Sequence, residues 1–268
     1  MDPYIFKANA ADHELYRLRL VEEALDESTT ALLKKTGVSA GWTCLEVGPG
    51  AGSILRWLGQ KVGRDGAAVA VDKKLTYLSE FVSLPYRVIE GDIRDVSLEG
   101  GFDLIHARYV LIHNQNSIDI IHRLRSLLKP GGYLVLEEPD FEASEWVDEY
   151  HSVPGNRVNA AMCAMFTNLG LDPGYGKRLP LALSQSGFKL EMTDAATHLA
   201  PGSSPVARLM AESAVALRSK YIATGKAEDA DIDTYVNAAR NPASWAIYYS
   251  TVAVIARAAA GENPSSDS

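Results

Sequence analysis

Three glycines, at 48, 50 and 52, are the residues of this chain whose spacing points first to ligand chemistry. They lie in the stretch LEVGPGAGS, where an apolar run precedes the glycines and the helical pattern SILRWLGQ follows them. Because glycine has no Cβ atom, backbone N–H groups in such a loop can approach a ligand closely. A strand, a glycine loop and a helix in this order predict a nucleotide-binding site.

Two carboxylates follow the next two apolar runs at the same point, where each run ends. Asp72 closes VAVD, 20 residues after Gly52, and can accept hydrogen bonds from ribose hydroxyls. Asp92 in EGDIRD could bind the amino group of a base, with Ile93 as an apolar wall for the ring. Each acid also has a structural interpretation, Asp72 as the N-cap of a helix over 74–83 and Asp92 as part of a simple turn.

The glycine spacing separates this loop from the fingerprint of dinucleotide enzymes. In G-x-G-x-x-G the third glycine permits close helix packing, with a pyrophosphate at the helix N-terminus. Here Ser53 stands at that position, Glu46 precedes the glycines, and no second βαβ half follows the fifth predicted strand. These features suit a ligand without phosphates whose amino-acid end is cationic.

Alternating strands and helices must position these residues. Apolar runs predict strands at 43–47, 67–72, 86–90, 102–106 and 133–137, with helical patterns near 53–61, 74–83, 109–113 and 117–128 between them. Helical spacing at 12–25, followed by a second short helix that ends at Gly37, precedes the first strand. Strands separated by helices predict a parallel sheet with helices on both faces, which binds ligands beyond the carboxyl ends of its strands.

Composition excludes several classes of protein. The chain has 268 residues, of which 47% are hydrophobic and 22% charged, and its net charge of −8 disfavours a nucleic-acid partner. The two cysteines, Cys44 and Cys163, are too few for a disulfide framework or a metal knuckle. With no apolar run of roughly 20 residues and no signal-peptide pattern, we expect a cytoplasmic chain without membrane or metal partners. Self-association is left open.

In five segments the sequence resembles the class I S-adenosylmethionine-dependent methyltransferases, over roughly residues 10–195. The segments are LEVGPGAG, VAVD, EGDIRD, FDLIHARYVLIHN and LKPGGYLVLEEPDF, in that family's order and spacing. The resemblance implies a doubly wound, mostly parallel, seven-stranded Rossmann-like sheet whose last hairpin is antiparallel. GFKLEMTD at 187–194 and SWAIYYSTVAVIARA at 244–258 fit the last two strands. It also implies S-adenosyl-L-methionine as cofactor and S-adenosyl-L-homocysteine as product.

The same resemblance assigns cofactor contacts residue by residue. Glu46, in place of the family's usual Asp, would surround the methionine part with Gly48, Gly50 and Gly52, Asp72 would bind the ribose, and Asp92 with Ile93 the adenine. His106 and Arg108 would line the cofactor near its methyl group, and Lys73 completes the predicted set. Arg108 could instead anchor a carboxylate of the cofactor or the substrate.

Catalysis of methyl transfer requires alignment of a nucleophile with the methyl carbon, and no covalent residue. For a hydroxyl acceptor a histidine could serve as general base, because its ordinary pKa is about 6.5. His113 is the first candidate and His106 the second, with a structural hydrogen-bonding role as the alternative for each. We expect Tyr109 and Glu138, at strand ends, to orient the substrate, and His151 is a further candidate in a lid loop.

Helical insertions are expected to cover the carboxyl edge of the sheet. The predicted organisation is N-terminal helices at 1–40, a cofactor-binding core at 41–195 with a helical insertion at about 141–175, a helical lid at 196–243, the last strand at 244–260 and a disordered tail at 261–268. Met162 and Phe166 belong to an apolar stripe of the first insertion, and a second helix begins at Ser204-Pro205. Such residues would form an adaptable roof over a small organic substrate.

The predicted function is methyl transfer from S-adenosylmethionine to oxygen, nitrogen or carbon of a small, lipophilic metabolite, as in natural-product biosynthesis. The alternative is a protein of the same fold that binds S-adenosylmethionine without transferring its methyl group, as a rearrangement catalyst or an assembly partner. Intact cofactor motifs fit both hypotheses, so the sequence alone leaves them open.

Overall fold

A single mixed sheet organises the chain in a computed structural model, which describes residue 6, residues 11–147 and residues 149–258. Within these residues the sheet has eight strands in the order β3-β2-β1-β4-β5-β8-β6, with β7 also paired to β8. The strands are β1 (Thr43–Val47), β2 (Ala67–Asp72), β3 (Tyr86–Glu90), β4 (Phe102–Arg108), β5 (Leu128–Asp140), β6 (Glu145–Trp146), β7 (Phe188–Pro201) and β8 (Trp245–Ala258). The predicted tail at 261–268 lies outside the described residues.

Strands β1 to β5 form the parallel part of the sheet, and β8 pairs antiparallel with β5, β6 and β7. The predicted fold class is thus confirmed, because the near-continuous apolar runs are those of strands buried on both faces. The prediction of seven strands omitted β6. This short strand pairs Trp146 with Ala246 of β8, and the buried Trp146 ring packs edge-on against Tyr235 and Tyr248.

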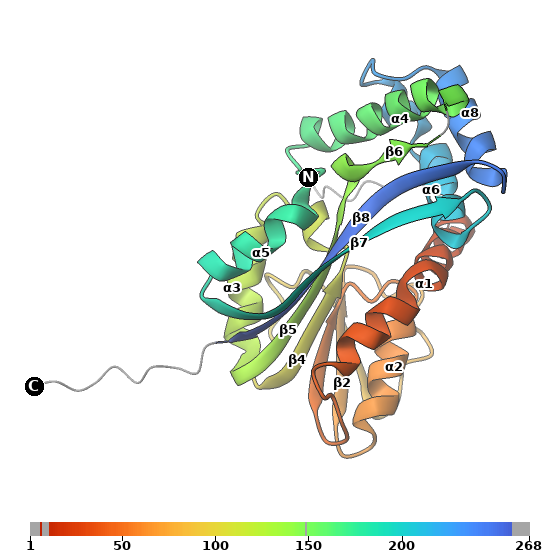
Figure 1. The fold of residues 1–268 in the computed structure, drawn as a ribbon. Helices are drawn as coiled ribbons and strands as arrows, with labels where there is room; N and C mark the ends of the chain where they lie inside the picture. The colour runs from red at the N-terminus through yellow and green to blue at the C-terminus, as the bar shows by residue number, and fades with distance from the viewer. Residues whose placement is uncertain (1–5, 7–10, 148, 259–268) are drawn as a thin grey trace, which may run out of the picture.

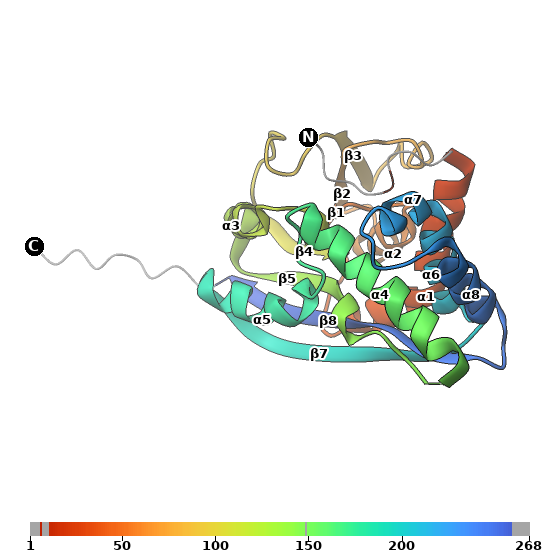
Figure 2. The ribbon, with the colours of Figure 1, turned by 90° about the horizontal axis from the view of Figure 1, so that it is seen from above.

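Helices cover both faces of the sheet and one of its ends. They are α1 (Ala11–Lys34), α2 (Ser53–Val62), α3 (Ser117–Leu127), α4 (Glu149–Asn168), α5 (Tyr175–Gln185), α6 (Pro205–Ala216), α7 (Arg218–Ile222) and α8 (Asp229–Arg240), with the short 3₁₀ turns η1 (Leu111–His113) and η2 (Phe141–Ala143). In Figure 1, α3 and α5 lie on one side of the sheet and α1 and α2 on the other. Figure 2 shows α4, α6, α7 and α8 gathered in one group, which contacts α1 through α6. No helix among the described residues has the length and apolar character to cross a bilayer.

The helix predicted at 74–83 is wrong. Residues 73–85 form turns and irregular chain, and Leu78 and Phe81 insert into the core beside the glycine loop. A Cβ atom built on Gly52 would lie 2.5 Å from the Phe81 ring, so the segment packs tightly on that loop. Tertiary packing has therefore overridden a local helical pattern.

The N-terminal region is one helix instead of the two that were predicted. Buried residues continue at helical spacing through Leu25, Thr29, Leu32 and Leu33, so the core-facing stripe of α1 is unbroken. The predicted start of α6 is confirmed, with Ser204 as N-cap and Pro205 in the first turn. The first half of α1 supplies residues to one wall of the cavity described below.

Candidate functional site

A cavity of about 430 Å³ opens at the carboxyl ends of the parallel strands. Its lining falls into two groups by the elements that supply it. We call the first the glycine-loop half: Glu46, Gly48, Gly50, Asp72, Asp92 and Ile93, from the ends of β1, β2 and β3. The second is the roof half: Phe141 on η2, Met162 and Phe166 on α4, Leu209 and Met210 on α6, and Tyr249 on β8. One cavity therefore joins a charged half to an apolar one.

The glycine loop has a backbone that only glycine adopts easily. Gly48, Gly50 and Gly52 have φ angles of +66°, +60° and +92°. A Cβ atom on Gly48 would lie 2.7 Å from Cγ2 of Val110, closer than real Cβ contacts. The bare backbone is thus required by the fold here, and at Gly48 and Gly50 it also borders the cavity.

Glu46 is held by a buried ladder of three charged side chains. Its Oε2 lies 2.7 Å from Nδ1 of His106, and Nε2 of His106 lies 3.1 Å from Oε1 of Glu137. Burial opposes a charge on His106, but the two carboxylates outweigh it and raise the pKa of His106 to about 9. Burial alone would raise the pKa of Glu137, but His106 lowers it below its ordinary value. The ladder therefore fixes the position of the Glu46 carboxyl group at the cavity wall.

Arg108 lies on the same strand as His106 and connects that strand to α1. Its guanidinium donates to Oδ1 of Asp26 at 3.0 Å and to the Thr29 hydroxyl at 2.9 Å. His106 is fully buried and does not line the cavity, whereas Arg108 lines it while its guanidinium is engaged by α1. The position of His106 favours support of Glu46 over contact with a ligand.

The first turn of α2 carries a carboxylate from α1. The backbone N–H of Ser53 donates to Oε1 of Glu22 at 3.1 Å, and Glu22 also lines the cavity. A helix N-terminus favours an anion, and in dinucleotide enzymes that anion is the pyrophosphate. Here a side chain of the protein takes this role. The Glu22 carboxylate and the buried Glu46 together oppose binding of a pyrophosphate and favour a ligand with positive charge.

Asp72 lines the cavity at the end of β2. Its Oδ1 accepts a hydrogen bond from the backbone N–H of Lys74 at 3.1 Å, which closes a local turn. Because no helix follows at 74–83, the N-cap interpretation of this acid is not realised. Burial raises the pKa of Asp72, against the hydrogen bonds from the amides of Lys74, Lys73 and Gly50.

Two cationic side chains that lie close in sequence or in space, Arg94 and Lys73, bind Asp92. Arg94 donates through Nε at 2.9 Å and through Nη2 at 2.5 Å, and Nζ of Lys73 lies 3.2 Å from Oδ2. The hydrogen bond from Arg94 holds the pKa of Asp92 well below its ordinary value, against the effect of burial. Ile93 is buried and lines the cavity beside it, as an apolar wall for a flat ring requires.

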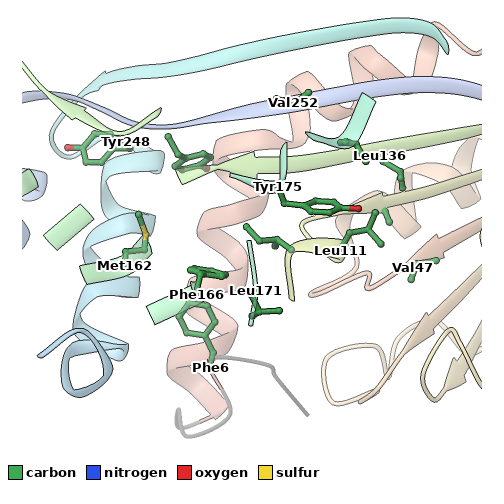
Figure 3. Close-up of a cluster of buried hydrophobic side chains, with 14 of the residues drawn as sticks. Phe6, Val47, Leu111, Leu136, Met162, Phe166, Leu171, Tyr175, Tyr248 and Val252 are labelled. Atoms are coloured by element: carbon green, nitrogen blue, oxygen red, sulfur yellow. The ribbon is translucent and has the colours of Figure 1, made fainter. Parts of the chain in front are cut away.

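Aromatic rings run through the roof half. His113 stacks on Phe166 with centroids 6.2 Å apart, and Phe166 lies 5.4 Å from Phe141. Phe141 in turn lies 5.7 Å from Tyr249, and Tyr249 lies 6.1 Å from Tyr109. Figure 3 shows Met162 and Phe166 within the same buried cluster. All of these residues line the cavity, so the predicted substrate-side residues Tyr109, Met162, Phe166 and His113 are brought together.

Glu138 does not line the cavity, although it was predicted to face the substrate. Its fully buried carboxylate accepts hydrogen bonds from the backbone N–H groups of Val110, Leu111 and Ile112 at 2.7–3.0 Å. Burial raises its pKa to about 8, although these three donors favour the anion. Successive strand residues face opposite sides, so Glu138 points away from Pro139, which does line the cavity. Glu138 thus holds the turn that carries His113.

His151 lies apart from the cavity lining and packs 5.9 Å from the Trp146 ring. Sequence reasoning missed other residues of the site: Glu22, Glu137, Phe141 and Tyr249. Strand alternation around EEPDF was the available signal for Glu137 and Phe141. No local signal identified Glu22 or Tyr249, because α1 and β8 reach the cavity only through the tertiary fold.

Comparison with known proteins gives one family match. The profile described as "Methyltransferase domain" matches residues 15–172. The curated relative methyltransferase str3 of Strobilurus tenacellus is 29% identical over 188 residues, which are 62% of this chain and 62% of that protein. This chain therefore covers less than two thirds of the relative's length.

Solved structures share the fold at low identity. Phosphoethanolamine N-methyltransferase 2 of Haemonchus contortus, solved with S-adenosyl-L-methionine, is 13% identical with a TM-score of 0.57, over 95% of this chain and 59% of that one. The [4+2]-cyclase SpnF is 17% identical with a TM-score of 0.55, over 88% of this chain and 81% of that one. These similarities establish the architecture and leave the reaction to be argued from the site.

Proposed function

The chain belongs to the methyltransferase domain family, and we propose that it transfers a methyl group from S-adenosylmethionine to a small, lipophilic acceptor. One observation carries the proposal: a single cavity joins the acidic glycine-loop half to the aromatic roof half. Such a cavity suits a cationic nucleoside at one end and an apolar molecule at the other. The two ligands would then lie in contact, as a direct transfer requires.

Residues of the glycine-loop half fit the cofactor. Gly48 and Gly50 present backbone to the cavity beside Glu46, where the methionine part of the cofactor would lie. Asp72 would accept hydrogen bonds from the ribose, and Ile93 would pack on the adenine. When bound, S-adenosylmethionine supplies an electrophilic methyl group on a positively charged sulfur. The buried Glu46 carboxylate favours that positive charge.

We assign His106 a positioning role. It lies between Glu46 and Glu137 and is fully buried, so it fixes the orientation of Glu46. Asp92, with Arg94 and Lys73 on its oxygens, would support the adenine side mainly through the fixed chain around Ile93. Arg108 would join α1 to the sheet in this scheme, since Asp26 and Thr29 hold its guanidinium.

The roof half would align the acceptor and exclude water. We propose that His113 and Phe166 hold and orient the acceptor. Met162, Met210 and Leu209 add apolar surface that adapts to different substrates. In this scheme α1 and α6, which lie within the predicted segments 1–40 and 196–243, act as the lid, because both contribute to the cavity lining.

Transfer of labelled methyl groups tests the proposal. The full chain is incubated with S-adenosylmethionine labelled in the methyl group and a panel of small lipophilic compounds with oxygen, nitrogen or carbon nucleophiles. We expect label in one product class and S-adenosylhomocysteine in equal amount. A solved structure of the same fold is a cyclase, so cofactor binding without transfer to any compound would favour the alternative of a non-transferring protein.

A further inference from the structure

The roof half carries a hydrogen-bonded chain of side chains that leaves the cavity. We propose that Tyr109, Thr251 and His198 conduct a proton from the acceptor to the surface, and that the acceptor is a hydroxyl on an aromatic ring. The inference rests on the proposed function and narrows its substrate class. Tyr109 is the catalytic residue of this proposal, and Thr251 and His198 are positioning residues that act through it.

Three elements distant in sequence supply the members of this hydrogen-bonded chain. Tyr109 lies just after β4 and lines the cavity, Thr251 lies on β8 and is buried, and His198 lies on β7 and is only partly buried. The Tyr109 hydroxyl lies 2.5 Å from Oγ1 of Thr251, and that oxygen lies 2.8 Å from Nε2 of His198. The chain thus connects the cavity to a partly exposed imidazole without a gap.

The backbone at Tyr109 is set for this contact. Its φ angle is +57°, a conformation uncommon for a residue other than glycine. Its backbone N–H donates to the carbonyl oxygen of Glu137 at 2.8 Å, and the turn that follows it is held by Glu138. A strained residue that neighbouring contacts hold in place is typical of functional sites.

The protonation states of Tyr109 and His198 set the direction in which the hydrogen bonds between them are donated. Burial raises the pKa of Tyr109 well above its ordinary value, so its phenol is neutral and donates to Thr251. Burial lowers the pKa of His198, so its imidazole is neutral at pH 7 and Nε2 can accept from Thr251. The tautomer with hydrogen on Nδ1 follows from this network. The Tyr109 oxygen then keeps a lone pair for the hydroxyl of an acceptor.

The rings around this chain favour a flat acceptor. Tyr249 lies 6.1 Å from Tyr109, 5.7 Å from Phe141 and 4.7 Å from His198, measured between ring centroids. Tyr109, Tyr249 and Phe141 all line the cavity. Aromatic pairs at these separations and tilts are favourable, so an aromatic acceptor could join the group of rings with its hydroxyl toward Tyr109.

A proton route matters most for an oxygen acceptor. An amine attacks with its own lone pair and can lose its proton to water afterwards, whereas a neutral hydroxyl is a weak nucleophile until its proton begins to leave. In the step we infer, the acceptor oxygen bonds to the methyl carbon while the carbon–sulfur bond breaks, and that electron pair remains on sulfur. The acceptor proton moves to the Tyr109 oxygen, the Tyr109 proton to Thr251, the Thr251 proton to Nε2 of His198, and His198 releases a proton to water.

Two phenols of different acidity test the route. 4-Methylphenol is neutral in mildly alkaline buffer, whereas 4-nitrophenol is largely ionised there and needs no proton acceptor. In Thr251→Val we expect transfer to 4-methylphenol to fall about 100-fold, the low end for proton-transfer catalysis, and transfer to 4-nitrophenol to change little. Thr197→Val is the matched control. The Thr197 hydroxyl lies 3.3 Å from the Ser250 hydroxyl on the same two strands, and neither residue belongs to the proposed proton route. Equal losses with both phenols would overturn the proposal.

Added imidazole distinguishes a relay from a structural role of His198. In His198→Ala we expect slow transfer to 4-methylphenol that imidazole in the buffer restores, since a mobile base can occupy the space left at the surface. Failure of rescue would contradict the relay. In His113→Ala we expect similar losses with both phenols. A loss confined to 4-methylphenol in that variant, with Thr251→Val unaffected, would assign the proton to His113 instead.

A binding measurement gives a readout independent of turnover. With S-adenosylhomocysteine present, we expect the full chain to bind 4-methylphenol about 5-fold more tightly than 4-methylanisole, which lacks the O–H group, and Tyr109→Phe to abolish this preference. Cofactor binding without affinity for or transfer to either phenol would refute the phenol assignment and leave the proposed function intact. Absence of cofactor binding would instead count against the proposed function itself.

Discussion

Different interactions hold the residues of the two halves of the cavity in place. In the glycine-loop half, positive φ angles and a buried ladder of charges fix each group, with Glu46, His106 and Glu137 bonded in series. In the roof half, helices distant in sequence bring apolar and aromatic side chains together mainly through packing, as with Phe166 on α4 and Met210 on α6. On the proposed function, we expect the first half to bind one ligand precisely and the second to tolerate repacking for another acceptor while the first is kept.

The largest effect is expected from Gly50→Val. Valine in the left-handed conformation is strained, and its side chain would enter the cavity, so we expect cofactor affinity to fall by about 100-fold or more. Gly63→Val is the matched control, because Gly63 has a similar φ of +66° with nothing within 4 Å and lies outside the cavity lining. Both variants should lose stability, but only the first should lose binding of S-adenosylhomocysteine in calorimetry. Equal binding losses would mean that the loop does not contact the cofactor.

The buried ladder predicts a pH dependence of stability. The pKa of His106 is raised from 6.5 to about 9 on folding, so its contribution is complete below pH 6.5 and is lost as the pH rises through about 9. We expect the free energy of unfolding to fall across this window by up to about 3 kcal/mol, measured by denaturant titration at a series of pH values.

Glu137→Gln sharpens this prediction, because it weakens the support of the imidazolium without removing the histidine. The pKa of His106 should then drop, and the loss of stability should move to lower pH. An unchanged profile in this variant would mean that the ladder does not govern the slope. Burial raises the pKa of Glu138 to about 8, which adds a loss of stability from about pH 4.5 upward, and Glu137→Gln should lessen this loss slightly because the Glu137 charge contributes to the shift.

Glu46→Gln compares the two carboxylates of the ladder. Both contact His106 and both are buried, but only Glu46 lines the cavity. We expect Glu46→Gln to weaken S-adenosylmethionine binding by about 10- to 100-fold, as for loss of a charged hydrogen bond, and Glu137→Gln to weaken it several-fold less. If the two variants weaken binding equally, Glu46 acts through the ladder and not by contact with the cofactor.

The smallest effect is expected in the roof half. Phe166→Leu should raise the acceptor KM about 3- to 10-fold through lost stacking, with cofactor affinity unchanged. Phe188→Leu is a control for stability, because Phe188 is also buried but does not line the cavity. A change of cofactor affinity in Phe166→Leu alone would show that the two halves are coupled.

The difference between the halves also explains what could be predicted from the sequence. The strand bounds around Asp72 and the glycines at 48, 50 and 52 follow from local patterns, and the start of α6 follows from its cap. The helix expected at 74–83 failed because Leu78 and Phe81 pack on the glycine loop, a contact that helical periodicity cannot reveal. Such errors arise where tertiary contacts compete with local propensity.

The roof half depends on contacts that no short motif encodes. Thr251 reaches Tyr109 and His198 only through the pairing of β8 with both β5 and β7. A shift of one residue in that register would turn Thr251 to the other face of the sheet. Glu22 likewise reaches the first turn of α2 only because α1 packs against α2 in the tertiary fold.

The central claim is that the glycine-loop half binds a sulfonium nucleoside and not a pyrophosphate. Calorimetric titration of the full chain with S-adenosylhomocysteine, S-adenosylmethionine and NAD tests it most directly. We predict one site per chain for the first two ligands, competition between them, and no effect of NAD on either. Tight binding of NAD, or its displacement of S-adenosylhomocysteine, would contradict the claim.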